Sequence, residues 1–331
     1  MSTPFPNSDD TRVPEQLPTP DTEVRLVAAG GRIVRANEVD LCAETFGYPA
    51  DPAILLVGNS MLSWEDEFCE RLAAGSRFVI RYDLRNTGRS VSYDADAPPY
   101  TLRDLVADVV GLLDVFGLGS AHLVGFGPGG WIGQLVALDH PDRVASLTLI
   151  STRPTAPGPN DPDLPEHSDE LMAHFMGVPE PDWSDRTAVI DHMIEAGRQM
   201  AGSRPFDEAA VRDAVGRVFD RTVDAMPSTA NHRSIHRSNQ LAGSFAVIDH
   251  GDRWRERLGD IGAPTLVIHG AEDPFFPHGN ALALADEIPG ARLLTLERTG
   301  YELPRAVWDL VVPAILQHTS GGPRPTHPPT R

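Results

Sequence analysis

Residues 123–134, LVGFGPGGWIGQ, have the pattern of a strand that turns sharply into a helix. A short apolar run ends at Val124, glycines crowd the bend, and an apolar helical stripe begins at Trp131. A strand–turn–helix of this kind with the pattern Gly-x-Ser-x-Gly presents a serine as a nucleophile. Here the pattern is GFGPG, so Gly127 stands where the serine is expected. The segment has the form for nucleophilic chemistry but lacks the attacking atom.

Pro128 removes a second group from the same turn. The residue after such a serine normally gives its backbone N–H to the negative oxygen that forms on the substrate. Proline suits the first turn of a helix but has no N–H to give. Loss of one such donor typically lowers the rate by about 10²–10³. The turn therefore predicts an enzyme that does not attack esters in the usual way.

The overall composition excludes several classes of partner. The net charge of -19 argues against nucleic acid, because binding to phosphates needs an excess of basic side chains. The sequence has no run of 18 apolar residues, which a membrane span would need. Its N-terminus lacks the basic and apolar parts of a signal peptide. Cys42 and Cys69 form neither a disulfide framework nor a metal-ligand pattern. We therefore expect a cytoplasmic protein without a metal or cofactor.

Strand-like and helix-like stretches alternate along most of the chain. The strand-like runs are residues 32–35, 40–46, 53–57, 78–82, 121–126, 146–150, 265–269 and 292–296. The helix-like stretches are residues 64–74, 102–116, 129–139, 279–288 and 305–318. The later strands are short and continuously apolar, as parallel strands covered on both faces are. The pattern predicts an α/β fold with a mostly parallel, eight-stranded sheet and helices on both faces.

The middle of the chain breaks this alternation. Residues 153–252 have only helical patterns and proline-rich breaks, which predict a helical cap inserted between the sixth and seventh strands. The core then consists of residues 26–152 and 253–319. Residues 1–25 and 320–331 are rich in proline and small or polar residues, so we expect both to be disordered. A cap over a sheet edge forms a closed pocket for a small molecule.

Five segments, in chain order, resemble the α/β-hydrolases and span roughly residues 30–318. They are AILLVGNSMLSW, VIRYDLRNTGRS, HLVGFGPGGWIGQLVALDHPDRVASLTLIST, PTLVIHGAEDPFFP and GARLLTLERTGYELP. The stretches EFCERLAAGSRFVIRYDLRNTGRS and GDRWRERLGDIGAPTLVIHGAEDP are most similar to the aclacinomycin methylesterase branch, whose members tailor aromatic polyketides. The resemblance implies an α/β-hydrolase fold, a Ser-His-acid triad and two backbone donors for an oxyanion.

The chain departs from this triad at two of its three positions. By the resemblance, Asp273 occupies the acid position and Tyr301, in GYELP, occupies the histidine position. Tyrosine, with an ordinary pKa near 10, is a poor base at neutral pH but a good hydrogen-bond donor. Tyr301 either donates to the reacting centre or only fills the space of the histidine. The loop at residues 58–61 lacks the usual His-Gly pair, so the second oxyanion donor stays open.

Further candidates for substrate binding surround these positions. Asn59 and Ser60 follow the third strand, where their polar groups are able to help stabilise an enolate. Phe126 and Trp131 flank Gly127, and Trp64 follows the loop of Asn59. All three aromatic rings suit stacking on a flat substrate, although the two tryptophans equally suit the core.

Histidines outside the triad position are also candidates. His232 and His236 have helical spacing on one face of the cap, where they either face the cleft or make surface hydrogen bonds. No third ligand accompanies them, so they do not predict a zinc site. His278 follows the acid loop and either replaces the missing base or lies in solvent at a helix start.

Together these residues predict a non-hydrolytic, cofactor-free enzyme that acts on a small, hydrophobic, polycyclic substrate. Gly127 widens the floor of the pocket and Pro128 removes a polar group from it. Orientation and water exclusion are then the main remaining means of catalysis, and they suit an intramolecular reaction. Atypical members of the polyketide-tailoring branch form carbon–carbon bonds, including Michael-type closures in enediyne pathways. The resemblance therefore makes a cyclase of aromatic polyketide biosynthesis the leading hypothesis.

Two other functions remain open on the sequence. The first is a catalytically inactive protein that binds a ligand. The second is a hydrolase whose water is activated by Asp273 or by a cap histidine. The oligomeric state is also open, with a homodimer among the alternatives.

Overall fold

A computed structural model of the chain describes residues 25–26, 31–158, 161–225, 232–241 and 244–320. Its strands are β1 (Arg25–Leu26), β2 (Arg32–Ala36), β3 (Val39–Phe46), β4 (Ala53–Val57), β5 (Phe78–Tyr82), β6 (Ala121–Phe126), β7 (Val144–Ile150), β8 (Thr265–Gly270) and β9 (Arg292–Leu296). They form one sheet in the order β1-β2-β3-β5-β4-β6-β7-β8-β9. The eight strands predicted from the sequence are confirmed, and the two-residue β1 is added at one edge.

The direction of the strands decides where a site forms. The strands from β5 through β9 in the sheet order pair in parallel, whereas β1, β2 and β3 pair antiparallel at one side. The loops that leave the carboxyl ends of β4, β6, β8 and β9 therefore meet at one edge of the sheet. These loops carry Asn59, Gly127, Asp273 and Tyr301.

The α-helices are α1 (Asp66–Ala74), α2 (Leu102–Val115), α3 (Pro128–Asp139), α4 (Asp169–Gly177), α5 (Arg186–Met200), α6 (Glu208–Ala225), α7 (His232–Leu241), α8 (Ser244–Val247), α9 (Gly279–Glu287) and α10 (Trp308–His318). Short 3-10 helices are η1 (Met61–Ser63), η2 (Pro141–Arg143), η3 (Arg255–Asp260) and η4 (Arg305–Val307). None of the helices in the described ranges is long and apolar enough to cross a membrane.

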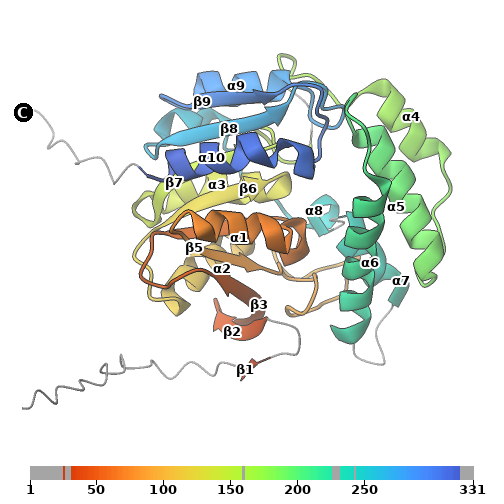
Figure 1. Ribbon diagram of the computed structural model, residues 1–331, viewed down its shortest axis with the longest axis horizontal. Coiled ribbons are helices and arrows are strands. Elements are labelled where there is room, and N and C mark those ends of the chain that lie inside the picture. The colour runs from red at the N-terminus through yellow and green to blue at the C-terminus, as the bar shows by residue number, and fades with distance from the viewer. Residues whose placement is uncertain (1–24, 27–30, 159–160, 226–231, 242–243, 321–331) are drawn as a thin grey trace, which may run out of the picture.

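Helices cover both faces of the sheet, as predicted (Figure 1). The side chains of α2, α3 and α9 join one apolar cluster, and those of α1 and α10 join a second cluster on the other face. All five residues of β4 are buried, because both faces of this strand are covered. Full burial of one large aliphatic side chain contributes about 1.5–3 kcal/mol, so the two clusters fix the scaffold beneath the loops.

Some boundaries predicted from the sequence are wrong by a few residues. The helix expected from Trp64 begins at Asp66, because Trp64 closes the preceding 3-10 turn. The helix expected over residues 305–318 is divided into η4 and α10. Arg25, placed in the predicted disordered segment, pairs with Ile33 in the sheet. Ser320, placed in the predicted disordered tail, hydrogen-bonds to Gln317 at the end of α10. Residues 1–24 and 321–331 lie outside the described ranges.

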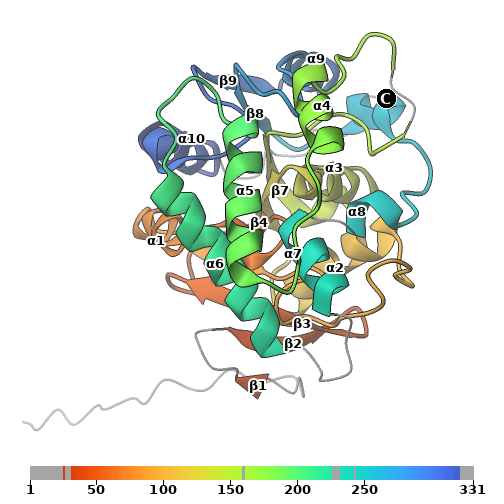
Figure 2. The same ribbon diagram turned by 90° about the vertical axis from the view of Figure 1, so that its right-hand side faces the viewer.

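Helices α4–α8 occupy the predicted insert between β7 and β8. Figure 2 shows α4–α7 in front of the ends of the strands, and Figure 1 shows the same helices to the right of the sheet. A small core of its own holds α5 and α6 together; it includes Trp183, Val189, Ile194, Val215 and Phe219. The insert is therefore a packed helical layer over the sheet edge.

Ion pairs and hydrogen bonds attach the α6 side of the cap to the core. Arg221 binds the fully buried Asp83 with a nitrogen–oxygen distance of 2.6 Å. Arg217 binds Asp66, which follows the loop of Asn59. In the turn between α5 and α6, the Ser203 hydroxyl bonds to Glu272, the residue before Asp273. These contacts fix the position of the cap relative to the loops of the site.

Candidate active site

A tight turn joins β6 to α3 at Gly127, as the sequence predicts. Gly127 has φ +54° and ψ -123°, a backbone conformation that favours glycine. Its N–H donates to the carbonyl of Ile150 at 2.9 Å, which ties the turn to β7. A Cβ atom on Gly129 would lie 2.2 Å from the carbonyl oxygen of Val57, so the helix start approaches β4 closely. The turn has the shape of a nucleophile elbow without its nucleophile.

The hydroxyl of Tyr301 occupies the space that a side chain at Gly127 would need. A Cβ atom built on Gly127 would lie 2.2 Å from the Tyr301 oxygen. The tyrosine ring packs among three phenylalanines, with centroid distances of 5.2 Å to Phe126, 5.0 Å to Phe275 and 5.8 Å to Phe276. One residue thus takes the position of the histidine and reaches the position of the serine oxygen.

The environment keeps the Tyr301 hydroxyl protonated. Burial, and then the negative charge of Asp273, raise its pKa well above the ordinary value near 10. At neutral pH the group is therefore a hydrogen-bond donor and not a base.

Asp273 is held by its own loop and lies beside a buried histidine. Its Oδ1 accepts hydrogen bonds from the N–H groups of Phe275 and Phe276, both at 2.8 Å. Its Oδ2 lies 3.1 Å from Nε2 of His269, which also lies 2.7 Å from the carbonyl of Phe276. Oδ2 has no hydrogen-bond partner among the described residues, so the hydrogen bond from Tyr301 that the fold would allow is not formed. Asp273 acts on Tyr301 through its charge.

The loop after β4 has no free pair of backbone donors for an oxyanion. The N–H groups of Asn59 and Ser60 both donate to the hydroxyl of Ser63, at 3.1 and 3.3 Å. The N–H of Met61 donates to Asp83 at 3.0 Å. With Pro128 in the elbow, both usual sources of an oxyanion donor are removed. The question that the sequence left open about this loop is thus answered.

A cavity of about 440 Å³ lies between the elbow and the cap. Its core side is formed by Asn59, Pro128, Trp131, Phe275 and Tyr301. Its cap side comes mainly from apolar residues of α4, α5, α7 and α8. The volume falls within the range of small-molecule sites, and the walls combine aromatic and aliphatic side chains with few polar groups. This cavity is the candidate active site.

Four of the predicted site residues line this cavity: Asn59, Pro128, Trp131 and Tyr301. The side-chain oxygen of Asn59 is buried and has no partner among the described residues, so it is available to a ligand. Ser60 instead caps η1, with its hydroxyl accepting from the N–H of Leu62.

The other predicted aromatic residues support the cavity from behind. Phe126 packs edge-on against Trp64 at 6.3 Å as well as against Tyr301. Trp64 is only 1% exposed and stacks on Phe68, so the structure places it in the core and not on the cavity wall.

Of the predicted histidines whose side chains are described, neither His236 nor His278 lines the cavity. His236 is buried and stacks on Phe219 with ring centroids 4.0 Å apart, although its neighbour Arg237 lines the cavity. His232 begins α7, and its side chain lies outside the described part of the chain. His278 pairs with the hydroxyl of Thr295 at 3.0 Å, and burial lowers its pKa.

Two cap histidines that the sequence analysis did not single out do line the cavity. They are His174 on α4 and His192 on α5. Burial lowers the pKa of His192 below its ordinary value. On α5, His192, Ala196 and Met200 recur at every fourth position, and all three line the cavity. That spacing was the available signal, but it does not tell a cavity wall from a packed helix face.

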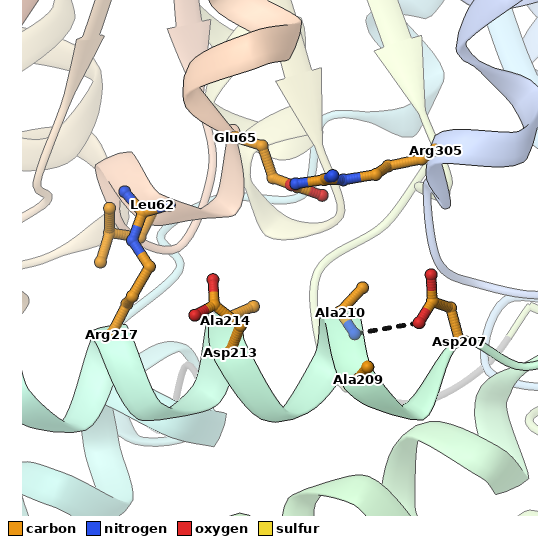
Figure 3. A pocket seen from close by; sticks show the side chains of 9 residues that line it. All are labelled: Leu62, Glu65, Asp207, Ala209, Ala210, Asp213, Ala214, Arg217 and Arg305. Carbon is orange, nitrogen blue, oxygen red and sulfur yellow. Dashed lines mark hydrogen bonds and ion pairs between the residues drawn. The ribbon is translucent and has the colours of Figure 1, made fainter.

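A second hollow of about 320 Å³ separates α6 from the core (Figure 3). Asp213 and Arg217 of α6, and Asp207 just before this helix, face Glu65 and Arg305 across it. Arg305 and Glu65 form an ion pair there. The hollow contains neither the elbow nor Tyr301, and its walls are strongly charged. It is a charged gap at the interface between cap and core, and we do not assign it as the reaction centre.

Glu302, next to Tyr301, has a carboxyl group that titrates near neutrality. Burial raises its pKa to about 7. Between the ordinary value near 4.3 and this value, the folded chain keeps a proton that the unfolded chain releases. The contribution of Glu302 to stability is therefore most favourable in acid and declines as the pH rises through 7.

Substitution Glu302→Gln is expected to stabilise the protein at pH 8 by about 1–3 kcal/mol, because the neutral amide avoids the buried charge. At pH 4 the variant and the unaltered chain should unfold at the same denaturant concentration. Urea unfolding at both pH values measures the difference. Glu70→Gln, at an exposed site on α1, is the matched control and should have no such pH-dependent effect. Equal stability of Glu302→Gln and the unaltered chain at pH 8 would contradict the raised pKa.

Comparisons with known proteins agree with this fold. The family model described as alpha/beta hydrolase fold matches residues 52–301. Rhodomycin D methylesterase DauP of Streptomyces sp. (strain C5) is 34% identical over 306 residues, which cover 87% of this chain and 97% of that protein. Rhodomycin D methylesterase DnrP of Streptomyces peucetius is 33% identical over 304 residues, covering 87% of this chain and 97% of its own.

A solved structure gives the same picture of the architecture. The 2-hydroxy-6-oxo-6-phenylhexa-2,4-dienoate hydrolase of Rhodococcus sp. strain RHA1 superposes with a TM-score of 0.64 at 19% identity. The match covers 91% of this chain and 100% of that chain, so it extends through the cap. With the family match and the two methylesterases, this shows that the chain belongs to the alpha/beta hydrolase fold family.

Proposed function

We propose that the protein is a cofactor-free enzyme that closes a ring on a polycyclic aromatic polyketide by forming a carbon–carbon bond. The reaction class is a Michael-type addition within one substrate molecule. The observation that carries the proposal is the Tyr301 hydroxyl, which lies 2.2 Å from where a Cβ on Gly127 would be. A hydrogen-bond donor thus replaces the nucleophile at the point where this fold performs its chemistry.

The similarity to the two rhodomycin D methylesterases supports the substrate class. A polycyclic substrate also suits the aromatic walls of the cavity, which include Trp131, Phe245 and Phe275. The absence of a serine at Gly127 and of the Pro128 N–H separates the reaction from the ester hydrolysis for which those relatives are named. The same kind of substrate is therefore expected to undergo a different step.

The proposed step balances without a co-reactant. An acidic C–H of the substrate gives its proton to solvent water, which returns a proton at the end of the step, and the resulting carbanion attacks the β-carbon of an enone in the same molecule. The electron pair moves to the carbonyl oxygen, which accepts a hydrogen bond from Tyr301. The α-carbon then takes up a proton, so the product is an isomer of the substrate. Holding the two carbons together and stabilising the enolate supply the rate.

Asp273 and Asn59 assist in different ways. Burial, and then the charge of Asp273, raise the pKa of Tyr301 further above neutrality, so its hydroxyl stays a donor. The Asn59 side chain presents a buried amide oxygen without a partner among the described residues, and this oxygen is able to orient a polar substituent of the substrate. Neither residue acts as a nucleophile in this step.

Two alternatives have structural arguments of their own. The internal bonding of the amides in the loop at residues 58–61 favours an inactive protein that only binds a polycyclic ligand. A hydrolase that uses a water activated by Asp273 is less favoured, because Oδ1 already accepts from two backbone N–H groups. Formation of an isomer from a polycyclic enone substrate separates the enzyme from the inactive protein. In H₂¹⁸O, uptake of label into product would identify the hydrolase.

The protein is expected to hydrolyse nitrophenyl esters no faster than buffer and to remain unlabelled by a fluorophosphonate probe. The reason is the combined loss of the serine, the histidine and the elbow N–H at Gly127, Tyr301 and Pro128. A serine esterase serves as the positive control in both assays. Turnover that disappears on substitution of one identifiable nucleophile would overturn the proposal of a non-hydrolytic enzyme.

A further inference from the structure

The cap wall of the cavity holds a polar group that the proposed reaction has not used. His192 of α5 lines the cavity, and its ring packs edge-on against Trp183 with centroids 5.6 Å apart. No described residue forms a hydrogen bond with either of its ring nitrogens. His192 is half-buried on this wall, and a ligand in the cavity is able to supply a hydrogen-bond partner for its ring.

The charged groups beside His192 neutralise one another. Glu180 accepts hydrogen bonds from the indole N–H of Trp183 at 3.0 Å and from Arg237 at 2.9 Å. These bonds lower the pKa of Glu180, so it stays ionised and balances the guanidinium of Arg237. Among the described residues that line the cavity, no other arginine is present. The wall therefore lacks an uncompensated cation that would favour a carboxylate or a phosphate.

The ionisation of His192 follows from the groups that face it. Burial is the largest cause of its lowered pKa; Glu180 opposes the shift, and the nearby His174 adds to it. Arg237 acts on it through Glu180, and Tyr301, on the opposite wall, is uncharged. The imidazole is therefore neutral at pH 7 and has one nitrogen that accepts a hydrogen bond.

We infer that the cavity wall at His192 is a subsite for an acidic hydroxyl group, phenolic or enolic, on the aromatic part of the substrate. A neutral imidazole accepts from such a hydroxyl, whereas a methyl ether at the same position has no proton to donate. The inference rests on the proposed function, because it specifies the substrate class for the same cavity. It adds a recognition element on the cap, opposite the donor at Tyr301.

Binding of two small probes to the full chain tests the subsite. The probes are 2-naphthol and 2-methoxynaphthalene, compared by isothermal titration calorimetry, with naphthalene as a control for ring shape. At pH 7 we expect 2-naphthol to bind about tenfold more tightly than its methyl ether, which corresponds to one buried hydrogen bond. Protonation of His192 removes the acceptor, so the preference should persist above pH 6.5 and be lost as the pH falls through the lowered pKa.

Three variants identify the residue responsible. His192→Phe keeps a flat ring against Trp183 and should reduce the preference to less than about twofold. His192→Gln keeps an acceptor that does not titrate, so it should retain the preference and lose its pH dependence. His174→Phe tests the other histidine of the cavity wall. It should retain the preference, but the pH at which the preference is lost should rise, because His174 lowers the pKa of His192. The midpoint of thermal unfolding of each variant shows that the fold is intact.

Several results would overturn the subsite. They are equal affinity of the unaltered chain for the two probes, no measurable binding of either, or loss of the preference in His174→Phe but not in His192→Phe. The result is separable from the proposed reaction. A tenfold preference without ring closure would support the subsite and contradict the proposed cyclase activity. Unchanged ring closure in His192→Phe would support the cyclase activity and contradict the subsite.

Discussion

Substitution Tyr301→Phe is expected to lower kcat for ring closure by about 100-fold or more. The change removes one oxygen and keeps the ring that packs among Phe126, Phe275 and Phe276. If the hydroxyl stabilises the enolate, its loss affects the transition state more than the bound substrate. KM should therefore change by less than kcat. Steady-state kinetics on the polycyclic substrate measure both.

Stability measurements separate this role from packing. The Tyr301 hydroxyl forms no hydrogen bond with any described residue, so urea unfolding of Tyr301→Phe should differ from the unaltered chain by less than about 1 kcal/mol. Tyr82→Phe is the matched control, because Tyr82 is buried and its hydroxyl lacks a partner among the described residues. It should leave kcat unchanged. A rate within a few-fold of normal in Tyr301→Phe would mean that the tyrosine only fills the space of the histidine.

The scaffold was predictable from the sequence because its signals are local. Strands such as β4 and β8 are short apolar runs, and burial of both faces requires that composition. The elbow was predictable for a related reason, since Gly129 lies too close to β4 to carry a side chain and such glycines mark the turn in the sequence. The resemblance then gave the positions of Asp273 and Tyr301, which lie on loops at the same sheet edge.

The cap side of the cavity was not predictable in the same way. His192 and His236 both lie on cap helices, and no local feature of the sequence tells which one lines the cavity. The difference arises from tertiary packing: α6 places Phe219 against His236, whereas the ring of His192 lies against Trp183 on the cavity wall. Asp273 gives a second example, because its pairing with His269 depends on how the acid loop folds back over β8.

The Tyr301 hydroxyl fits at its position because Gly127 has no side chain, and Gly127→Ala tests this dependence. The added Cβ would lie 2.2 Å from the tyrosine oxygen, and φ is +54° at this position. We expect a loss of about 2–4 kcal/mol in the free energy of unfolding, from overpacking and from the unfavourable backbone conformation. Ring closure should be lost as well, because the hydroxyl must leave its position. Urea unfolding and kinetics of the single variant measure the two effects.

The double variant Gly127→Ala with Tyr301→Phe should recover about 1–3 kcal/mol of that loss, because the oxygen that collides with the Cβ is absent. The next nearest atom, Cζ of Tyr301, lies 3.3 Å from the added Cβ, a tight but tolerable contact. Gly290→Ala isolates the backbone effect, since Gly290 has φ +69° and no atom within 4 Å of its would-be Cβ. Gly290→Ala should lower the free energy of unfolding by about 1 kcal/mol, and this effect should be additive with that of Tyr301→Phe. Strictly additive free energies for Gly127→Ala and Tyr301→Phe would mean that the tyrosine moves aside freely. The hydroxyl would then not be fixed at the reaction centre, and its assignment as the enolate donor would fail.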